Sequence, residues 1–244
     1  MGWWNKLVRD KKETEAECQV DFWSIVPGME NIEPPVPAIK EMPEWFRDLP
    51  REHVGAGGRP ETAKACPAFI DYFKQGYVLK MWTDVEVDVH KDGQYYWNTP
   101  NNKFWQFTNQ GNAQFKDHIP NDPYSMIFKA ICPWRVRTPP GWAIMQLPLF
   151  YNYNKDFTAL PGVIWSDIHY DISQHLALYN YGVTKIERGT PLCLFVPFKR
   201  DSVKYNVGPM TDELRKVTEV GYRRWADVFA GGYKNLQRKI SKEK

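Results

Sequence analysis

Hydrophobic and polar residues alternate most regularly between residues 77 and 89. The end of this segment alternates Val85, Val87 and Val89 with Asp84, Glu86 and Asp88. A period of two places one set on each face of an extended chain, so the pattern predicts a half-buried strand. The turn sequence His-Lys-Asp-Gly at 90–93 leads into a second apolar segment at 94–98, which predicts a β-hairpin.

Short segments of similar character recur along the chain. They cover residues 18–28, 125–137, 142–150, 169–180, 183–189 and 191–200. A Pro-Pro-Gly turn at 139–141 separates the second from the third. Short strands with turn signals about every 8 to 12 residues are typical of β-sandwiches and barrels. The pattern therefore predicts a mainly β protein.

Helical signals are confined to the two ends of the chain. A short helix is expected within 43–50, begun by Pro43 and stopped before Pro50, and another within 61–76, closed by Gly76. A stripe of helical period follows at the end: Leu214, Val217, Gly221, Trp225, Val228, Tyr233, Leu236 and Ile240. We thus expect one globular unit: an N-terminal arm with short helices (1–75), a β core (76–200) and a C-terminal helical extension (201–244).

The first residues form a second apolar stripe. Trp3, Trp4, Leu7 and Val8 share one face of a possible helix among basic residues. Such a helix could lie on a membrane surface. We favour packing on its own domain or on a neighbouring subunit, because two aromatic stripes need a surface to cover.

Composition excludes several functional classes. The four cysteines among the 244 residues are scattered, which excludes a Cys-rich zinc site and disfavours a disulfide framework. The net charge of +3 does not indicate nucleic-acid binding. No apolar stretch reaches the roughly 20 residues of a membrane span, and no signal-peptide core follows Met1. No glycine-rich phosphate loop follows a strand.

Residues 138–196 resemble the central part of the trimeric dUTPase and dCTP-deaminase superfamily, which has the β-clip fold. Pro139-Pro140-Gly141 matches a turn of that family, and Gly162-Val163-Ile164 with Asp167 matches its Gly-Val-Ile-Asp-x-Asp strand. Gly189 and Leu192 match its third motif. The resemblance implies a β-clip-like or distorted β-sandwich core with the arm and helix attached.

The residues that carry the family's chemistry are replaced. Leu149-Phe150-Tyr151 stands where the family has a phosphate-binding Arg-Ser-Gly, and Trp165 stands where it has the aspartate that positions water. Thr190-Pro191 replaces an Asp-Arg pair, Leu194 replaces a glutamine, and the Gly-rich C-terminal lid is absent. Apolar groups cannot supply the electrostatic or proton-transfer effects of hydrolysis. The sequence therefore predicts that the fold is kept and the catalysis lost.

One polar constellation remains in the segment 167–175. If this segment is a strand, Asp167, His169, Asp171, Ser173 and His175 share one face. His169 and Asp171 have the His-x-Asp spacing of some iron sites on β-sandwiches, but a third ligand would have to come from His90, His118 or Asp84. We favour a polar strand facing solvent or a subunit over a metal site.

Two charged groups also have alternative interpretations. Lys155, Arg188, Lys199 and Arg200 are candidates for a phosphate or anion site, and Asp84, Glu86 and Asp88 for a cation site. Charges at strand ends and on strand faces are more often solvated, and we favour that interpretation for both.

The sequence as a whole favours a non-catalytic protein that acts in binding or assembly. It also resembles uncharacterised tailed-bacteriophage proteins in the segments PEWFRDLP, KACPAFIDYFKQGY and GTPLCLFVPFKR, which implies a phage origin and a location in the host cytoplasm or the virion. We expect no cofactor, and a homo-oligomer (a trimer first) or other phage proteins as partners, with a nucleotide as a further candidate ligand. The alternative is a diverged nucleotide hydrolase or deaminase, or a His-x-Asp metal enzyme.

Overall fold

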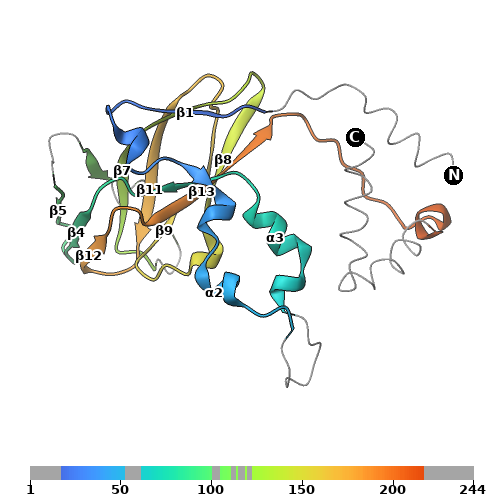
Figure 1. The fold of residues 1–244 in the computed structure, drawn as a ribbon, viewed down its shortest axis with the longest axis horizontal. Helices are drawn as coiled ribbons and strands as arrows, with labels where there is room; N and C mark the ends of the chain where they lie inside the picture. The colour runs from blue at the N-terminus through green and yellow to red at the C-terminus, as the bar shows by residue number, and fades with distance from the viewer. Residues whose placement is uncertain are drawn as a thin grey trace.

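A computed structural model of the protein describes residues 18–52, 62–100, 105–110, 114, 119 and 123–216. Its described residues form three antiparallel sheets, which confirms the mainly β prediction. Figure 1 shows the strands gathered in one body, with the helices α2 and α3 beside it and the chain after β13 leading away from it. The aromatic stripe of residues 3–8 and most of the C-terminal stripe lie outside the described residues.

The first sheet has the order β1-β7-β11-β9, with β6 beside β7. Its strands are β1 (Asp21–Ser24), β6 (Phe107–Asn109), β7 (Met126–Arg137), β9 (Phe157–Ala159) and β11 (Asp171–Leu178). The second sheet has the order β10-β8-β13-β3-β2. Its strands are β2 (Val36–Pro37), β3 (Tyr77–Lys80), β8 (Trp142–Pro148), β10 (Gly162–Ile164) and β13 (Pro191–Lys199). Since β1 and β2 belong to these sheets, part of the segment 1–75 is built into the core.

The third sheet is a small one, β12-β4-β5, formed by β12 (Gly182–Ile186), β4 (Val85–Val89) and β5 (Tyr95–Asn98). The predicted hairpin is present, because β4 and β5 pair and the His90 N–H donates to Gln94 O at 2.9 Å across the turn. The valines of β4 are buried, as their alternation predicts.

The prediction of one strand over 77–89 is wrong. Residues 77–80 pair within the second sheet and residues 85–89 within the third. The residues between them, Met81 to Thr83, are all buried, and an extended chain cannot bury successive side chains on one face. The chain therefore bends at Met81, whose N–H donates to Thr190 O at 2.8 Å.

Within the described residues, five short helices lie between β1 and β3. They are η1 (Met29–Asn31), η2 (Ala38–Glu41), α2 (Glu44–Asp48), η3 (Ala63–Ala65) and α3 (Pro67–Phe73). Both expected helices are present, although the second begins only at Pro67, where proline suits the first helical turn. One core cluster joins residues of all three sheets, including Phe128, Leu176, Phe195 and Val87.

Gly76 closes the segment after α3 against the second sheet. Its φ is +66°, and a Cβ added there would lie 1.8 Å from the carbonyl oxygen of Phe195. Only glycine fits this close approach of two backbones. The same backbone accepts a bond from the Ala38 N–H at 3.1 Å, which joins η2 to this strand end.

Candidate functional site: an aromatic pocket between two sheets

The predicted polar strand at 167–175 is wrong in its first half. β10 ends at Ile164 and β11 begins at Asp171, so residues 165–170 form a turn. The N–H groups of Ile168 and His169 donate to Trp165 O at 3.1 and 2.9 Å. The turn exists because Ser166 is fully buried, with its hydroxyl 2.7 Å from that of Thr138 beside the Pro-Pro-Gly turn. Asp167, His169 and Asp171 therefore do not share a strand face.

Asp167 holds three segments of the chain together. Its Oδ2 accepts from the N–H of Gly141 at 2.9 Å and also pairs with the guanidinium of Arg200. Arg200 stacks over the ring of Trp165, with its Cζ 4.0 Å from the ring centroid, and its N–H donates to Gly141 O at 2.8 Å. The Asp167 side chain is nearly buried, at 6% exposure, and that of Arg200 is 21% exposed. The contacts of this carboxylate therefore stabilise the fold.

The other members of the predicted constellation are separated. His169 is exposed in the turn, and the carboxylate of Asp171 pairs with Arg135 of β7. His175 is half-buried, and its Nε2 lies 2.8 Å from Nε2 of Gln110. Burial, and then the charge of Lys129 on the neighbouring strand, lower the pKa of His175. This histidine is held neutral.

Metal ligands are not gathered within the described part of the chain. No group of three His, Cys, Asp or Glu side chains there could hold an ion. His90 lies 3.3 Å from Asp88, and His118 is outside the described residues. Of the other strand acids, Asp84 accepts from the N–H of Arg188 at 2.8 Å and Glu86 pairs with a lysine at 2.6 Å.

The four predicted anion ligands lie at separate places in the fold. Arg188 precedes β13 and Lys199 ends it, and the strand from Pro191 to Lys199 alone spans about 26 Å at ~3.3 Å per residue. Arg188 lies 3.9 Å from Glu33, and Lys199 lies 3.2 Å from Asp201. Lys155 is exposed in the loop before β9. The four cations therefore do not form one site.

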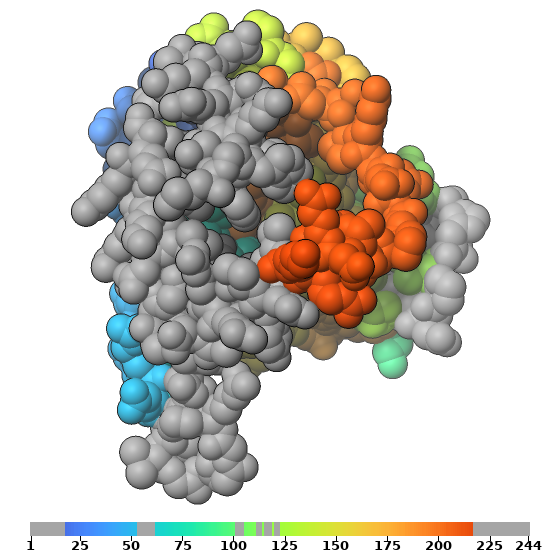
Figure 2. Space-filling view, turned by 90° about the vertical axis from the view of Figure 1, so that its right-hand side faces the viewer, coloured from blue at the N-terminus to red at the C-terminus, as the bar shows by residue number. Residues whose placement is uncertain are grey.

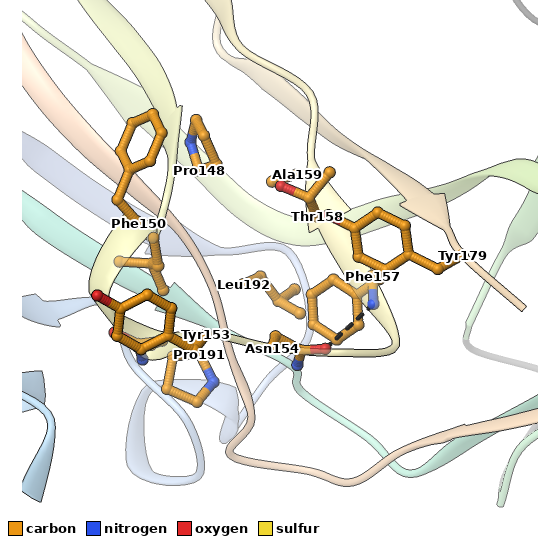
Figure 3. Close-up of a pocket in the computed structure, with 12 residues that line it drawn as sticks. Pro148, Phe150, Tyr153, Asn154, Phe157, Thr158, Ala159, Tyr179, Pro191 and Leu192 are labelled. Carbon is orange, nitrogen blue, oxygen red and sulfur yellow. Dashed lines mark hydrogen bonds between the residues drawn. The ribbon is translucent and has the colours of Figure 1, made fainter. Parts of the chain in front are cut away.

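A pocket of about 270 Å³ opens where the first and second sheets separate. One wall is the 3-10 turn η6 (Phe150–Asn152) with Tyr153, and the opposite wall is β9. Figure 3 shows Phe150 and Tyr153 facing Phe157 and Tyr179 across the opening, with Leu192 between them. The complete lining is Pro148, Leu149, Phe150, Asn152, Tyr153, Asn154, Phe157, Thr158, Ala159, Tyr179, Pro191 and Leu192.

The wall formed by η6 is fixed to the helices by aromatic contacts. Tyr151 packs against Phe69, Tyr72 and Phe73 of α3 at centroid distances of 5.5, 5.2 and 5.5 Å. The carbonyl of Tyr151 accepts from Trp45 Nε1 of α2 at 2.8 Å. These contacts partly bury Tyr151 against α3, while its neighbours Phe150 and Asn152 line the pocket.

Tyr153 has an unusual backbone at the rim of this pocket. Its φ is +49°, the single positive φ of a non-glycine residue in the described chain. The left-handed region costs a residue with a Cβ roughly 1 kcal/mol or more. Its ring lies 5.7 Å from that of Trp45, and both rings are largely exposed. Strain of this kind is found at binding sites, where it is part of the arrangement.

Asn154 completes the rim by ordering the loop that follows. Its Oδ1 accepts from the N–H groups of Asp156 and Phe157 at 2.8 and 3.1 Å. The side-chain lining is apolar or aromatic apart from two asparagines, a threonine and tyrosine hydroxyls, and none of it is charged. Such a site can bind an apolar or aromatic group. It offers no cation for a phosphate.

The sequence shows part of this site but not its role, because Leu149-Phe150-Tyr151 stands out there only as a replacement of phosphate ligands. The run of aromatic residues from 150 to 157 was the available signal, because it interrupts the alternation of a strand. The rest of the lining could not be predicted, since Tyr179 and Leu192 come from later segments that meet η6 only in the folded sheets.

The sequence matches no protein family model, and no curated protein matches it. Among solved structures, the chain is similar to a mutant of the dUTPase of Staphylococcus bacteriophage 80alpha, solved with dUpNHpp. The TM-score is 0.36 and the identity 9%, over 80% of this chain and 90% of the other. A likeness of this degree leaves the function to be argued from the site itself.

Proposed function

We propose that this protein is a non-catalytic binding or assembly module, and that the pocket between η6 and β9 receives an apolar side chain of a protein partner. The observation that carries the proposal is the lining, which exposes Phe150 and Tyr153 at the rim and has no charged side chain. Aromatic side chains around an apolar pocket are typical of the energetically dominant positions in protein interfaces.

The lining of the pocket supports an apolar side chain over a nucleotide. A triphosphate needs cations or a cluster of N–H donors, and no charged side chain lines the pocket. Lys155 is the nearest of the predicted anion ligands in sequence, and it does not line the pocket.

The enzymatic alternative has less support. A general base must reach a substrate with a free lone pair, whereas Oδ2 of Asp167 is used by Arg200 and Gly141 and its Oδ1 is buried away from solvent. A His-x-Asp metal centre would need Asp171, whose carboxylate is paired with Arg135. The proposal includes a phage origin, a place in the host cytoplasm or virion, and a homo-oligomer or another phage protein as partner. No helix in the described chain is long and apolar enough to cross a membrane.

Saturation-transfer NMR on the full chain tests the pocket, with N-acetyl-tyrosinamide as the probe and dUTP as the comparison. We expect the probe to bind with a dissociation constant near 1 mM, which corresponds to about 4 kcal/mol. Phe150→Ser should weaken binding at least fivefold. Tyr96→Ser is the matched control, because Tyr96 is 61% exposed on the third sheet and Phe150 is 64% exposed. Equal binding to both variants, or no binding at all, would refute the pocket as the site.

A separate assay addresses catalysis. Purified protein with Mg²⁺ should form neither dUMP from dUTP nor dUTP from dCTP. Turnover that persists in His169→Ala and disappears in Asp167→Asn would establish the enzyme alternative.

A further inference from the structure

The pocket continues into a group of exposed aromatic rings on the side of α2. Phe150, Tyr153 and Trp45 are 64%, 70% and 42% exposed, and the rings of Tyr153 and Trp45 lie 5.7 Å apart. We call these three side chains the aromatic rim. Figure 1 shows α2 beside the body of strands, and Figure 2 shows this segment, in light blue, at the surface. Aromatic groups gathered at a surface are costly in water and mark a contact with another molecule.

The fold keeps the aromatic rim in place at a cost in free energy. The positive φ of Tyr153 costs roughly 1 kcal/mol or more, which glycine at this position would avoid. The indole of Trp45 is fixed by its bond to the carbonyl of Tyr151 at 2.8 Å. The exposed ring of Tyr153 does not offset this strain by burial. Its role therefore lies in binding another molecule.

Asn154 at the rim favours a ligand that is rich in hydrogen-bond acceptors. Its Oδ1 is already used by the N–H groups of Asp156 and Phe157. The part of this side chain that is left for a ligand is the NH₂ group, which donates hydrogen bonds and does not accept them. No charged side chain lines the pocket. The complementary ligand over the pocket is therefore uncharged and offers carbonyl oxygens beside apolar surface.

Two common forms of a bound peptide do not suit this site. An extended segment would pair with β9, at the edge of the first sheet, but Phe157 and Ala159 are only 4% and 2% exposed. An amphipathic helix lays a row of side chains into one long groove, whereas a pocket of about 270 Å³ here lies beside exposed rings. A polyproline II segment needs neither an open strand edge nor a long groove, because its backbone makes no internal hydrogen bonds and stays solvated.

We propose that the aromatic rim binds a proline-rich segment of a partner protein in the polyproline II conformation. One apolar side chain of the segment enters the pocket, and its prolines pack on Trp45 and Tyr153. Proline has a carbonyl group but no N–H, so the segment brings acceptors to Asn154 and no donor that would need a partner at the interface. Its conformation is largely fixed before binding, which lowers the entropy lost on association. The inference rests on the proposed function and names the chemistry of the partner.

Asp48 determines the charge expected next to the prolines. It follows Trp45 by three positions in α2, so the two side chains are neighbours on the helix surface. It is exposed, and no ion pair involves it within the described residues. A lysine or arginine that follows the prolines of the partner would meet this carboxylate and the face of the indole. We therefore expect a basic residue at the end of the bound segment.

Fluorescence anisotropy with the full chain tests the proline-rich segment. The probe is a labelled PPLPPLPPR peptide, and the comparison is AALAALAAR, in which alanine replaces every proline. We expect the proline peptide to bind at least tenfold more tightly. Tyr153→Gly should weaken its binding at least tenfold while Tm stays equal or rises, because glycine accepts a positive φ without strain. Tyr96→Ser, which changes an exposed tyrosine on the third sheet, should leave binding unchanged.

A second pair of peptides tests the role of Asp48. PPLPPLPPR should bind the natural protein about threefold more tightly than PPLPPLPPQ, as is usual for an exposed ion pair. Asp48→Asn should remove this preference. Glu30→Gln is the matched control, because Glu30 is exposed on η1 and glutamine can keep its hydrogen bond from Asn31. A preference for arginine that persists in Asp48→Asn would overturn the charge assignment.

The two probes distinguish this inference from the proposed function. Equal binding of the proline and alanine peptides, or undiminished binding to Tyr153→Gly, would overturn the inference. If N-acetyl-tyrosinamide binds in a manner that depends on Phe150 while the proline peptide does not bind, the inference fails alone. If neither probe binds, the proposed function fails as well.

Discussion

The pair of Asp167 and Arg200 gives the sharpest test of the view that the segment 162–167 serves the fold. Arg200→Met removes the guanidinium but keeps an apolar stem over Trp165. The carboxylate of Asp167, which is only 6% exposed, then keeps a hydrogen bond from the N–H of Gly141 but loses its charged partner. Its other oxygen, Oδ1, is already buried without a hydrogen bond. We therefore expect a large loss of stability.

The magnitude follows from burial. Removing one partner of a buried ion pair costs about 3 to 5 kcal/mol. The lower end applies here, because the Arg200 side chain keeps 21% exposure and some water reaches the pair. A loss of about 3 kcal/mol corresponds to a fall in Tm of about 6 to 12 °C for a domain of this size.

The two partners should differ in their effect. Asp167→Asn keeps an acceptor for Gly141 and leaves a guanidinium that can turn toward solvent, so we expect a loss of only about 1.5 kcal/mol. The double variant should lose about 1 to 2 kcal/mol less than the sum of the single changes. Removing both charges together leaves no buried ion without a partner.

Urea unfolding followed by tryptophan fluorescence and circular dichroism measures these free energies, provided that the two signals coincide and the slopes agree. A loss below about 1 kcal/mol for Arg200→Met, which is usual for a surface substitution, would refute the argument. So would additive effects in the double variant, because additivity means that the two side chains do not interact.

Three further results are expected. The pKa of His175 lies below its usual value because of burial and then Lys129. The free energy of unfolding should therefore fall as pH drops below about 6.5, where the unfolded chain takes up the proton first. His175→Gln should remove this dependence, and parallel pH profiles of stability for the variant and the natural protein would contradict the prediction. His169→Ala should change stability by under about 1 kcal/mol, and the purified protein should contain no equivalent of iron, manganese or zinc whose loss follows this change. Gly76→Ala should lower the free energy of unfolding by about 3 kcal/mol or more, because the added Cβ meets backbone. Gly93→Ala has open space around it and should lower it by only about 1 to 2 kcal/mol, through backbone strain. Similar urea midpoints for the two variants would contradict the close approach at Gly76.

Local patterns determined much of the secondary structure from the sequence alone. The valines of β4 alternate with acids, and that alternation both predicts the strand and explains why Val85, Val87 and Val89 are buried. Pro67 begins α3 because proline suits a first helical turn. These features depend on neighbours within a few residues, which the sequence displays directly.

Contacts between distant segments were decided only by the tertiary structure. In the sequence Asp167 is a candidate ligand, because its partner Arg200 lies 33 positions away. The alternation of polar and apolar residues also continues across 165–170, although Ser166 is buried in the core beside Thr138. The pocket likewise needs η6, β9 and the start of β13 together. The sequence could reveal the apolar character of Phe150, but not that this residue faces Phe157 across a pocket, because that relation exists only after the sheets have formed.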